Sequence, residues 1–191
     1  MIELSLYPKK TILRDGTPIT LRPMTGEDEA AVLEFFLGVP EEERWFLKED
    51  VTSPRVVRQW LQNLDYKKAL PLLAETESGK VVADAVLIRR RGGSRAHVGE
   101  LRIVVAPAFR QRGLGVLLMR ELCDIANDAG LERVVAEMVA DTEEDAVRAA
   151  EWMGFYKLAT LEGMARDLAG HDHDLLVMAM PLGRYYEWSK F

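Results

Sequence analysis

Residues 100–115 read Glu-Leu-Arg-Ile-Val-Val-Ala-Pro-Ala-Phe-Arg-Gln-Arg-Gly-Leu-Gly, and this stretch decides the fold. Its apolar, β-branched beginning, Leu101 to Val105, is typical of a buried strand. Pro107 ends that strand, because proline donates no hydrogen bond to a sheet. From Val116 onward, apolar residues recur at helical spacing until Gly130, a common helix stop. The stretch therefore predicts a strand, a tight loop and an amphipathic helix.

The loop between these two elements has the properties of an anion site. It consists of Arg110, Gln111, Arg112, Gly113, Leu114 and Gly115. The first amides of a helix have no acceptor within the helix, and the helix dipole is positive there. The two glycines let a ligand approach the backbone, and the two arginines add positive charge. We expect the loop to bind a pyrophosphate. The alternative is a purely structural turn.

Two other phosphate loops do not fit this segment. The dinucleotide fingerprint needs a third glycine, and a Walker A loop needs Gly-Lys-Ser/Thr. The form Arg-x-x-Gly-x-Gly, placed between a strand with a proline and an amphipathic helix, resembles the acetyl-CoA signature of the GCN5-related N-acetyltransferase (GNAT) superfamily. It is similar, less specifically, to the acetyltransferase domains of protein lysine acetyltransferases.

The resemblance extends to both sides of this loop. Arg22-Pro23-Met24-Thr25 resembles the family's opening strand and capped helix, and Trp152-Met153-Gly154-Phe155 resembles its closing helix. The similarity covers roughly residues 17–182, and its specific motifs lie in the central third. It implies a single-domain α/β fold, with a mixed, bent sheet of about seven strands flanked by about four helices.

Composition limits the classes of protein to be considered. The 191 residues suit one domain, and 48% are hydrophobic, which is enough for a substantial core. A net charge of −6 argues against a nucleic-acid binder. The sequence has no uncharged apolar run of about 18 residues, which a membrane span would need. Its short acidic N-terminus is unlike a signal peptide. We therefore expect a cytoplasmic protein. The single cysteine, Cys123, lies within the helical apolar pattern and is expected to be a buried, inert thiol.

The chain divides into a leader with an edge strand (1–16), an acetyltransferase domain (17–182) and an aromatic tail (183–191). The tail packs on the core or joins a dimer, so a monomer and a homodimer both remain open. Strands are expected at 19–22, 70–76, 81–89, 96–105, 133–139, 156–162 and 175–182, with a loop over 163–174. Helical segments are expected near 25–37, 39–64, 116–129 and 143–153.

Local signals refine the first and last of these helices. Thr25 with Asp28 forms an expected capping pair, and so does Thr142 with Asp145. Leu37 belongs to the expected apolar face of the first helix. The crossover through the central helix should place strand 133–139 parallel to strand 96–105.

The resemblance also implies how a cofactor would be held. In the family, the central strand and its parallel neighbour splay apart, and pantetheine inserts between them. By that likeness, the backbone of Val104 and Val105 would contact the pantetheine or the thioester carbonyl, and residues 110–115 would take the pyrophosphate. The implied cosubstrate is acetyl-CoA, with no metal.

Glu100 is the candidate general base, by resemblance to the glutamate that deprotonates the amine in relatives. A primary ammonium has a pKa near 10.4, so a base is needed at neutral pH. The alternative is an exposed glutamate paired with Arg102 or Arg133. The acceptor would be a primary amine, either a small molecule or a protein lysine, and the sequence does not choose between them.

The sequence departs from the family where a general acid is expected. Alignment on Gly154 puts Glu143 where relatives have Asn, Ala146 where they have Ala, and Ala150 where they have Tyr. The acid is therefore missing or replaced by water. This leaves open a catalytically silent acyl-CoA-binding regulatory module, and also a phosphate-loop protein for another nucleotide such as ATP or NAD.

The run His171-Asp172-His173-Asp174 invites a metal interpretation. In an extended chain at most two of the four side chains share a face, and no distant Cys/His pair completes a tetrahedral set. Turn chemistry is the preferred interpretation. A role for His173 or Asp174 on the substrate side is a further hypothesis.

Overall fold

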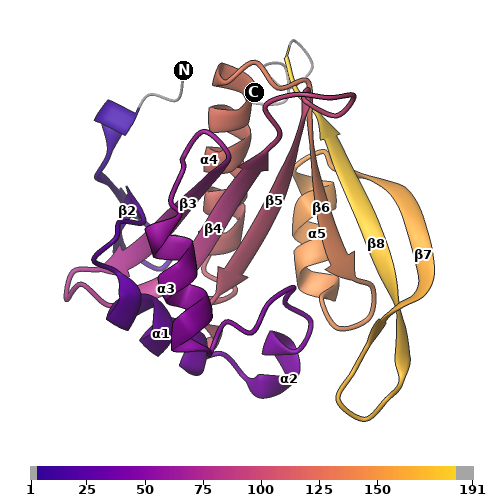
Figure 1. Ribbon diagram of the computed structural model, residues 1–191, viewed down its shortest axis with the longest axis horizontal. Helices are drawn as coiled ribbons and strands as arrows, with labels where there is room; N and C mark the ends of the chain where they lie inside the picture. Colours follow the sequence, from indigo (N-terminus) through magenta and orange to yellow (C-terminus); the bar gives the residue numbers. More distant parts are fainter. Residues whose placement is uncertain (1–3, 184–191) are drawn as a thin grey trace.

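An eight-stranded sheet runs through the part of the chain that the computed structural model describes, residues 4–183 (Figure 1). Its strands are β1 (Lys9–Ile12), β2 (Pro18–Pro23), β3 (Ala69–Thr76), β4 (Val81–Arg89), β5 (Val98–Val105), β6 (Arg133–Val139), β7 (Tyr156–Arg166) and β8 (Asp172–Pro181). The α-helices within these residues are α1 (Glu29–Leu37), α2 (Glu41–Arg44), α3 (Pro54–Gln62), α4 (Leu114–Asp128) and α5 (Glu144–Trp152). Two 3₁₀ turns, Leu4–Leu6 and Pro107–Phe109, precede β1 and α4.

The strand order is β1-β2-β3-β4-β5-β6-β8-β7. Only β5 and β6 pair in parallel among the described strands, and the other neighbours are antiparallel. A parallel pair needs a crossover, and α4 supplies it. The predicted mixed α/β sheet and the predicted parallel pair are thus confirmed. The eighth strand, β1, comes from the segment that the sequence gives as a leader with an edge strand.

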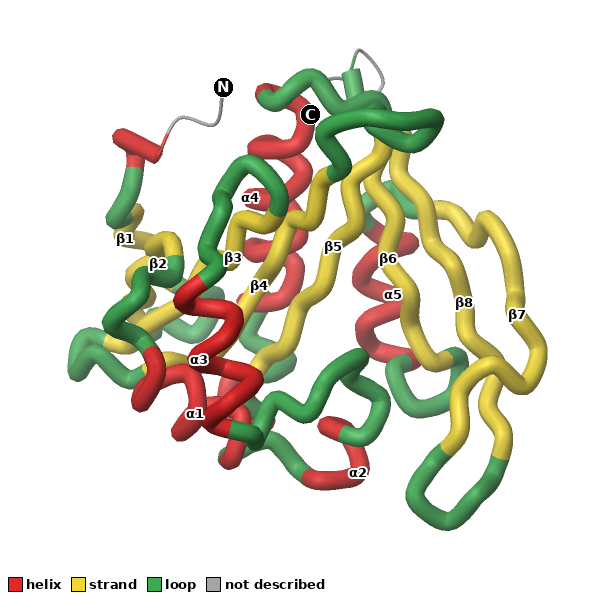
Figure 2. Tube along the Cα trace, viewed as in Figure 1, coloured by secondary structure: helices red, strands yellow, loops and turns green. Residues whose placement is uncertain are grey.

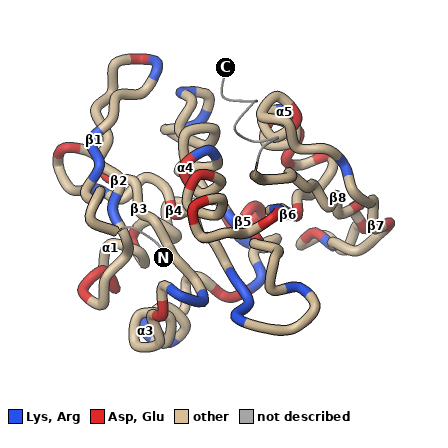
Figure 3. Tube along the Cα trace, turned by 90° about the horizontal axis from the view of Figure 1, so that it is seen from above, with Lys and Arg blue, Asp and Glu red and all other residues tan. Residues whose placement is uncertain are grey.

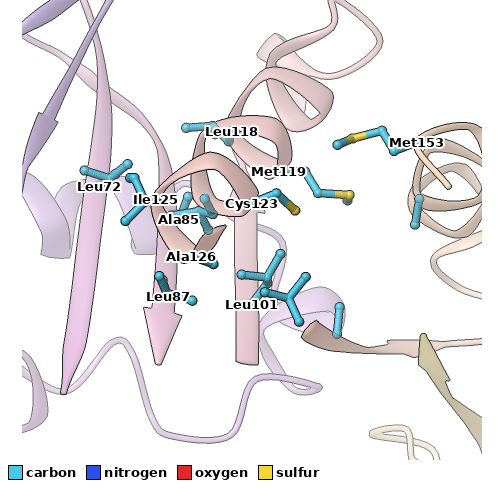
Figure 4. Close-up of a cluster of buried hydrophobic side chains, with 14 of the residues drawn as sticks. Leu72, Ala85, Leu87, Leu101, Leu118, Met119, Cys123, Ile125, Ala126 and Met153 are labelled. Atoms are coloured by element: carbon cyan, nitrogen blue, oxygen red, sulfur yellow. The ribbon is translucent and has the colours of Figure 1, made fainter. Parts of the chain in front are cut away.

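Helices cover both faces of the sheet (Figure 2). Side chains alternate along a strand, so Leu72 faces the cluster that includes α4 and α5, whereas Leu73 faces α1 and α3. On the α4 side, Leu118 and Cys123 are fully buried among the apolar side chains of β3, β4 and β5 (Figure 4). The predicted burial of Cys123 is confirmed.

The first helix, α1, does not have the predicted N-cap. It begins at Glu29, and Asp28 rather than Thr25 stands at its N-cap. The Asp28 carboxylate accepts the backbone N–H of Thr25 at 2.6 Å and pairs with Arg22 at 2.6 Å, so this ion pair fixes the chain where the pattern suggested a capping box. The predicted place of Leu37 in the apolar face is also wrong. It is 61% exposed, while Val32, Phe35 and Phe36 are buried.

Helices α4 and α5 begin at residues other than those predicted. α4 starts at Leu114, two residues before the helical pattern becomes visible at Val116. α5 starts at Glu144 with Glu143, not Thr142, at the N-cap. Asp145 does not complete a capping box, because its carboxylate pairs with Arg148.

The β7–β8 hairpin is much longer than predicted. Most of the expected loop over 163–174 belongs to the two strands, which extend to Arg166 and begin again at Asp172. A register shift between Leu161 and Ala165 interrupts the alternation, and Gly163 lies there with a φ of 62°. This bulge hides the strand pattern in the sequence. The predicted aromatic tail lies outside the described residues, except for Gly183.

Acidic and basic residues are interspersed over the elements of the fold (Figure 3). None of the helices within residues 4–183 has the length and the apolar run that crossing a membrane requires.

Asp84 is an acidic residue within the sheet. It lies on β4 opposite Leu73 of β3 and Val104 of β5, and it is 7% exposed. Within residues 4–183, its Oδ1 atom has no hydrogen-bond partner. Burial raises the pKa of Asp84 to about 7. The carboxyl group is therefore held neutral in acid solution by the cost of burying its charge.

This position predicts a pH-dependent stability. The folded-state pKa lies above the unfolded one, so the stabilisation is complete below the unfolded pKa and is lost as the pH rises through about 7. Asp84→Asn should raise the free energy of unfolding near pH 8 by up to about 4 kcal/mol, and by less near pH 5. Urea unfolding at both pH values measures this. Glu77→Gln, which neutralises an exposed turn residue, should show no such pH dependence, and an Asp84→Asn gain that is the same at both pH values would contradict the assignment.

Candidate active site

The sheet opens between β5 and β6. Their pairing runs from Val98 opposite Arg133 to Leu101 opposite Ala136 and ends there, although β5 continues to Val105 and β6 to Val139. Each strand stays paired on its other side, β5 with β4 up to its last residue and β6 with β8. The lower ends of β5 and β6 diverge in Figure 1. Residues 102–105 therefore have no strand partner on the β6 side among the described residues.

The N-terminus of α4 lies directly after β5. Gly113 stands at the N-cap with a φ of 88°, and no side chain caps the helix. Glycine is needed there by the left-handed backbone, not only by the approach of a ligand. A Cβ at Gly115 would meet only Val105 Cγ2, at 3.9 Å, so space is open beside the first turn. The loop also holds Gln111 at a φ of 58°.

The two arginines of the loop are tied to carboxylates from elsewhere in the chain. Arg110 forms a bidentate pair with Glu43 of α2, one bond being 2.8 Å, and its Nε donates to the Val105 carbonyl at 3.0 Å. Arg112 pairs with Asp15 at 3.0 Å and lies over the Phe109 ring. The predicted positive charge is thus present, but it is offset by internal counter-charges.

A hollow of about 220 Å³ adjoins the loop on the outer side of α4. Arg14, Arg112, Arg120 and Trp152 line it together with Gly113. It offers cationic groups and an aromatic surface beside the start of the helix.

Glu100 lies where the pairing of β5 with β6 is about to end. Its Oε1 atom accepts hydrogen bonds from Lys48 Nζ at 2.8 Å and from Arg102 Nε at 2.9 Å. Burial acts to raise the pKa of Glu100, but the bonds from Lys48 and Arg102 outweigh it and hold the pKa below its ordinary value. The ion pair with Arg102, which was the alternative interpretation of Glu100, is therefore present in the structure, and Lys48 is an additional partner.

Lys48 also contacts Glu137 of β6, at 2.8 Å. Glu100 pairs in register with Val135, and Glu137 follows two residues later on the same face of the sheet. One ammonium group therefore bridges the two strands at the point where they part. Sequence reasoning missed Lys48 and Glu137. A charged residue within the apolar strand 133–139 was the available signal for Glu137, and Lys48 carried none.

The loop after α2 lies against the β7–β8 hairpin. Trp45 Nε1 donates to the Arg166 carbonyl at 2.8 Å, and the Phe46 ring meets His173 edge-on at 5.6 Å. His173 in turn pairs through Nδ1 with Asp141 at 2.8 Å. These contacts connect two segments far apart in sequence on the side of the sheet opening.

The run His171 to Asp174, at the start of β8, does not form a four-ligand cluster. His171 pairs with Asp167, which His173 also approaches at 3.5 Å, and Asp174 accepts the backbone N–H of Gly163 at 3.0 Å. Within residues 4–183, no group of three or more His, Cys, Asp or Glu side chains is arranged to hold a metal ion.

The start of α5 supplies one largely buried carboxyl group, that of Glu143. The Glu143 carboxylate accepts the backbone N–H of Val139 at 2.6 Å, and burial raises its pKa. Ala146 packs against the core, and Ala150 is fully buried within it. Ala150, predicted to correspond to the family's Tyr, thus has no polar side-chain atom, whereas Glu143, for which the sequence predicts no role, has a carboxyl group able to hold a proton.

The sequence also matches a family model, that of the acetyltransferase (GNAT) family, over residues 34–155, more than half of the chain. The chain belongs to the GNAT acetyltransferase family. The predicted fold and the predicted family are thereby confirmed, and the matching family model is one of acetyltransferases.

Individual GNAT proteins are similar to this chain. Acetyltransferase Pat of Mycolicibacterium smegmatis is 28% identical over 138 residues, 71% of this chain, and the chain spans only 41% of that relative's length. The ribosomal-protein-alanine N-acetyltransferase of Brucella melitensis is 26% identical with a TM-score of 0.71, covering 85% of this chain and 99% of that one. A phosphinothricin acetyltransferase of Sinorhizobium meliloti, solved with acetyl-CoA, is 19% identical with a TM-score of 0.72, covering 86% and 89%.

Proposed function

We propose that this chain transfers an acetyl group from acetyl-CoA to a primary amine. The observation that carries the proposal is the parting of β5 from β6 beside the uncapped N-terminus of α4. The first feature offers strand edges without a strand partner to an amide-bearing arm, and the second offers helix-start amides to a diphosphate. Coenzyme A has both of these parts.

The cofactor residues proposed are those that border the opening and the loop. The backbone of Val104 and Val105 would face the pantetheine, and residues 110–115 would hold the pyrophosphate. Open space beside Gly115 supports this placement. Arg110 and Arg112 would exchange their carboxylate partners for phosphate oxygens, which are matched to the guanidinium fork.

Glu100 is the proposed general base. It borders the opening, it is partly buried, and it already contacts an amine. While Lys48 and Arg102 hold its pKa low, Glu100 is a weak base. A substrate ammonium that displaces Lys48 would take its place beside Glu100, while Arg102 stays bonded, and Glu100 would then be positioned to accept the proton as the amine attacks.

The leaving thiolate requires little assistance. A thiol has a pKa of about 8.5, so it can depart as the anion or take a proton from water. Glu143 is the proposed additional donor, because its raised pKa favours the protonated form and it lies at the start of α5, next to the end of β6.

The acceptor proposed is a cationic amine. Glu100 and Glu137 place two carboxylates at the opening, where an ammonium group would be attracted and a carboxylate repelled. The relatives named above differ in their acceptors, so a small amine and a protein lysine both fit the proposal.

Matched glycine variants test the cofactor site. Gly113 and Gly130 both have positive φ angles, 88° and 77°, so alanine at either position should lower the free energy of unfolding by about 1–2 kcal/mol. Only Gly113→Ala should also weaken the binding of coenzyme A, roughly tenfold or more, because it alters the first amides of α4. Calorimetric titration measures this. Equal affinities of the two variants for coenzyme A would exclude the loop as its binding site. Tighter binding of ATP or NAD than of coenzyme A by the unaltered protein would exclude coenzyme A as the preferred ligand.

Replacing the Glu100 carboxylate by a carboxamide tests its role as the general base. Glu100→Gln should lower kcat/KM by roughly 10²–10⁴-fold at neutral pH, with the deficit narrowing at high pH as the amine deprotonates unaided. Thiol release from acetyl-CoA over an amine panel and a pH series measures this. Glu132→Gln, an exposed change just before β6, should leave the rate unaltered. A Glu100→Gln profile that matches the unaltered protein would remove Glu100 from its role, and binding of acetyl-CoA without turnover on any amine would support the silent module instead.

A further inference from the structure

Lys48 occupies the position that an acceptor amine would take. Its Nζ atom lies 2.8 Å from Glu100 Oε1 and 2.8 Å from Glu137 Oε2. These two residues flank the opening between β5 and β6. The proposed base is therefore already in contact with a primary amine of the same chain.

The loop that carries Lys48 is anchored on both sides. Before it, Trp45 donates a hydrogen bond to the Arg166 carbonyl, and Phe46 packs edge-on against His173. After it, Val51 is buried in the cluster beneath α1 and α3. The loop therefore holds Lys48 at the opening, and its contacts with Glu100 and Glu137 follow from the position of the loop.

Lys48 is also accessible and charged. Its side chain is 43% exposed, so the amine can be reached without unfolding the loop. Burial acts to lower the pKa of Lys48, but the bonds to Glu100 and Glu137 outweigh it and raise the pKa. The amine is protonated at rest and needs a base before it can act as a nucleophile.

We propose that Lys48 is an internal acceptor: the protein acetylates its own Lys48 side chain with acetyl-CoA. This inference rests on the proposed function, because it uses the same donor and the same base. Lys48 and Glu100 belong to one chain, so the reaction is intramolecular and gains from their fixed proximity.

The step balances as follows. Glu100 takes one proton from the Lys48 ammonium, and the free amine attacks the thioester carbonyl carbon, forming a C–N bond. The C–S bond breaks, and the leaving thiolate receives the second proton from the attacking nitrogen. The products are an amide at Lys48, free coenzyme A thiol and one proton, which Glu100 returns to solvent.

Acetylation would change the opening itself. An amide carries no charge, so Glu100 and Glu137 would lose the cation that they share. The Lys48 side chain would then no longer bridge β5 and β6, and the two carboxylates would be available to an incoming ammonium group, while Trp45, Phe46 and Val51 keep the loop in place. Self-acetylation therefore prepares the site for an external acceptor.

The test is a time course of the purified protein with acetyl-CoA and no added acceptor, followed by peptide mass spectrometry. We expect one acetyl group per chain at Lys48, appearing with a rate constant that does not depend on protein concentration. Lys48→Arg keeps the cation between the carboxylates but cannot accept acetyl, so label at this position should be lost. Lys80→Arg, at an exposed turn, should leave labelling of Lys48 unaltered.

Two results would overturn the inference while leaving the proposed function standing. One is turnover on external amines with Lys48 unmodified. The other is labelling of Lys48 that is equally fast in Glu100→Gln, since this would be uncatalysed reaction with the thioester. An apparent first-order rate constant that rises in proportion to protein concentration would overturn the intramolecular step. Absence of turnover on every amine tested would be a failure of the proposed function itself.

Discussion

The parting of β5 from β6 is the constraint on which the rest of the structure depends. β4 holds β5 in register from Ala83 to Arg89, and β8 holds β6 from Val139 to Arg133. Each strand follows its other neighbour once the short parallel pairing has ended at Leu101. The central helix begins directly beyond β5, so the opening and the uncapped helix start come from one continuous segment. One strand thereby positions both halves of the proposed cofactor site.

Charged groups around this opening are paired with partners from distant parts of the same chain. Glu43 holds Arg110, Asp15 holds Arg112, and Lys48 holds Glu100. Most side chains in these pairs are more than a third exposed, so each pair contributes little to stability and chiefly sets where its side chains lie. A ligand bound at this site as proposed would replace an existing counter-charge. Its binding would then be an exchange of ion pairs.

The sequence predicted the parts of the site that are local. The change from strand to helical periodicity after Val105 located the loop, and the glycines marked its tight conformation. Pairs such as Lys48 with Glu137 join segments far apart in the chain, and no periodicity reports them. The predicted start of the first helix is too early: Asp28 itself stands at the N-cap, and its carboxylate is held by Arg22 and by the Thr25 N–H. The long hairpin was missed because the bulge near Gly163 breaks the alternation by which strands are recognised.

On the side that faces β6, residues 102–105 have no strand partner among the described residues, and the Val105 carbonyl accepts a bond from Arg110 instead. This has a consequence for the protein without its cosubstrate. Peptide groups that face no neighbouring strand will accept any extended molecule bearing amides, and a stray polypeptide qualifies as well as a pantetheine arm. If coenzyme A binds there as proposed, it would cover these peptide groups, and the protein without it would be more prone to aggregate through this part of the sheet.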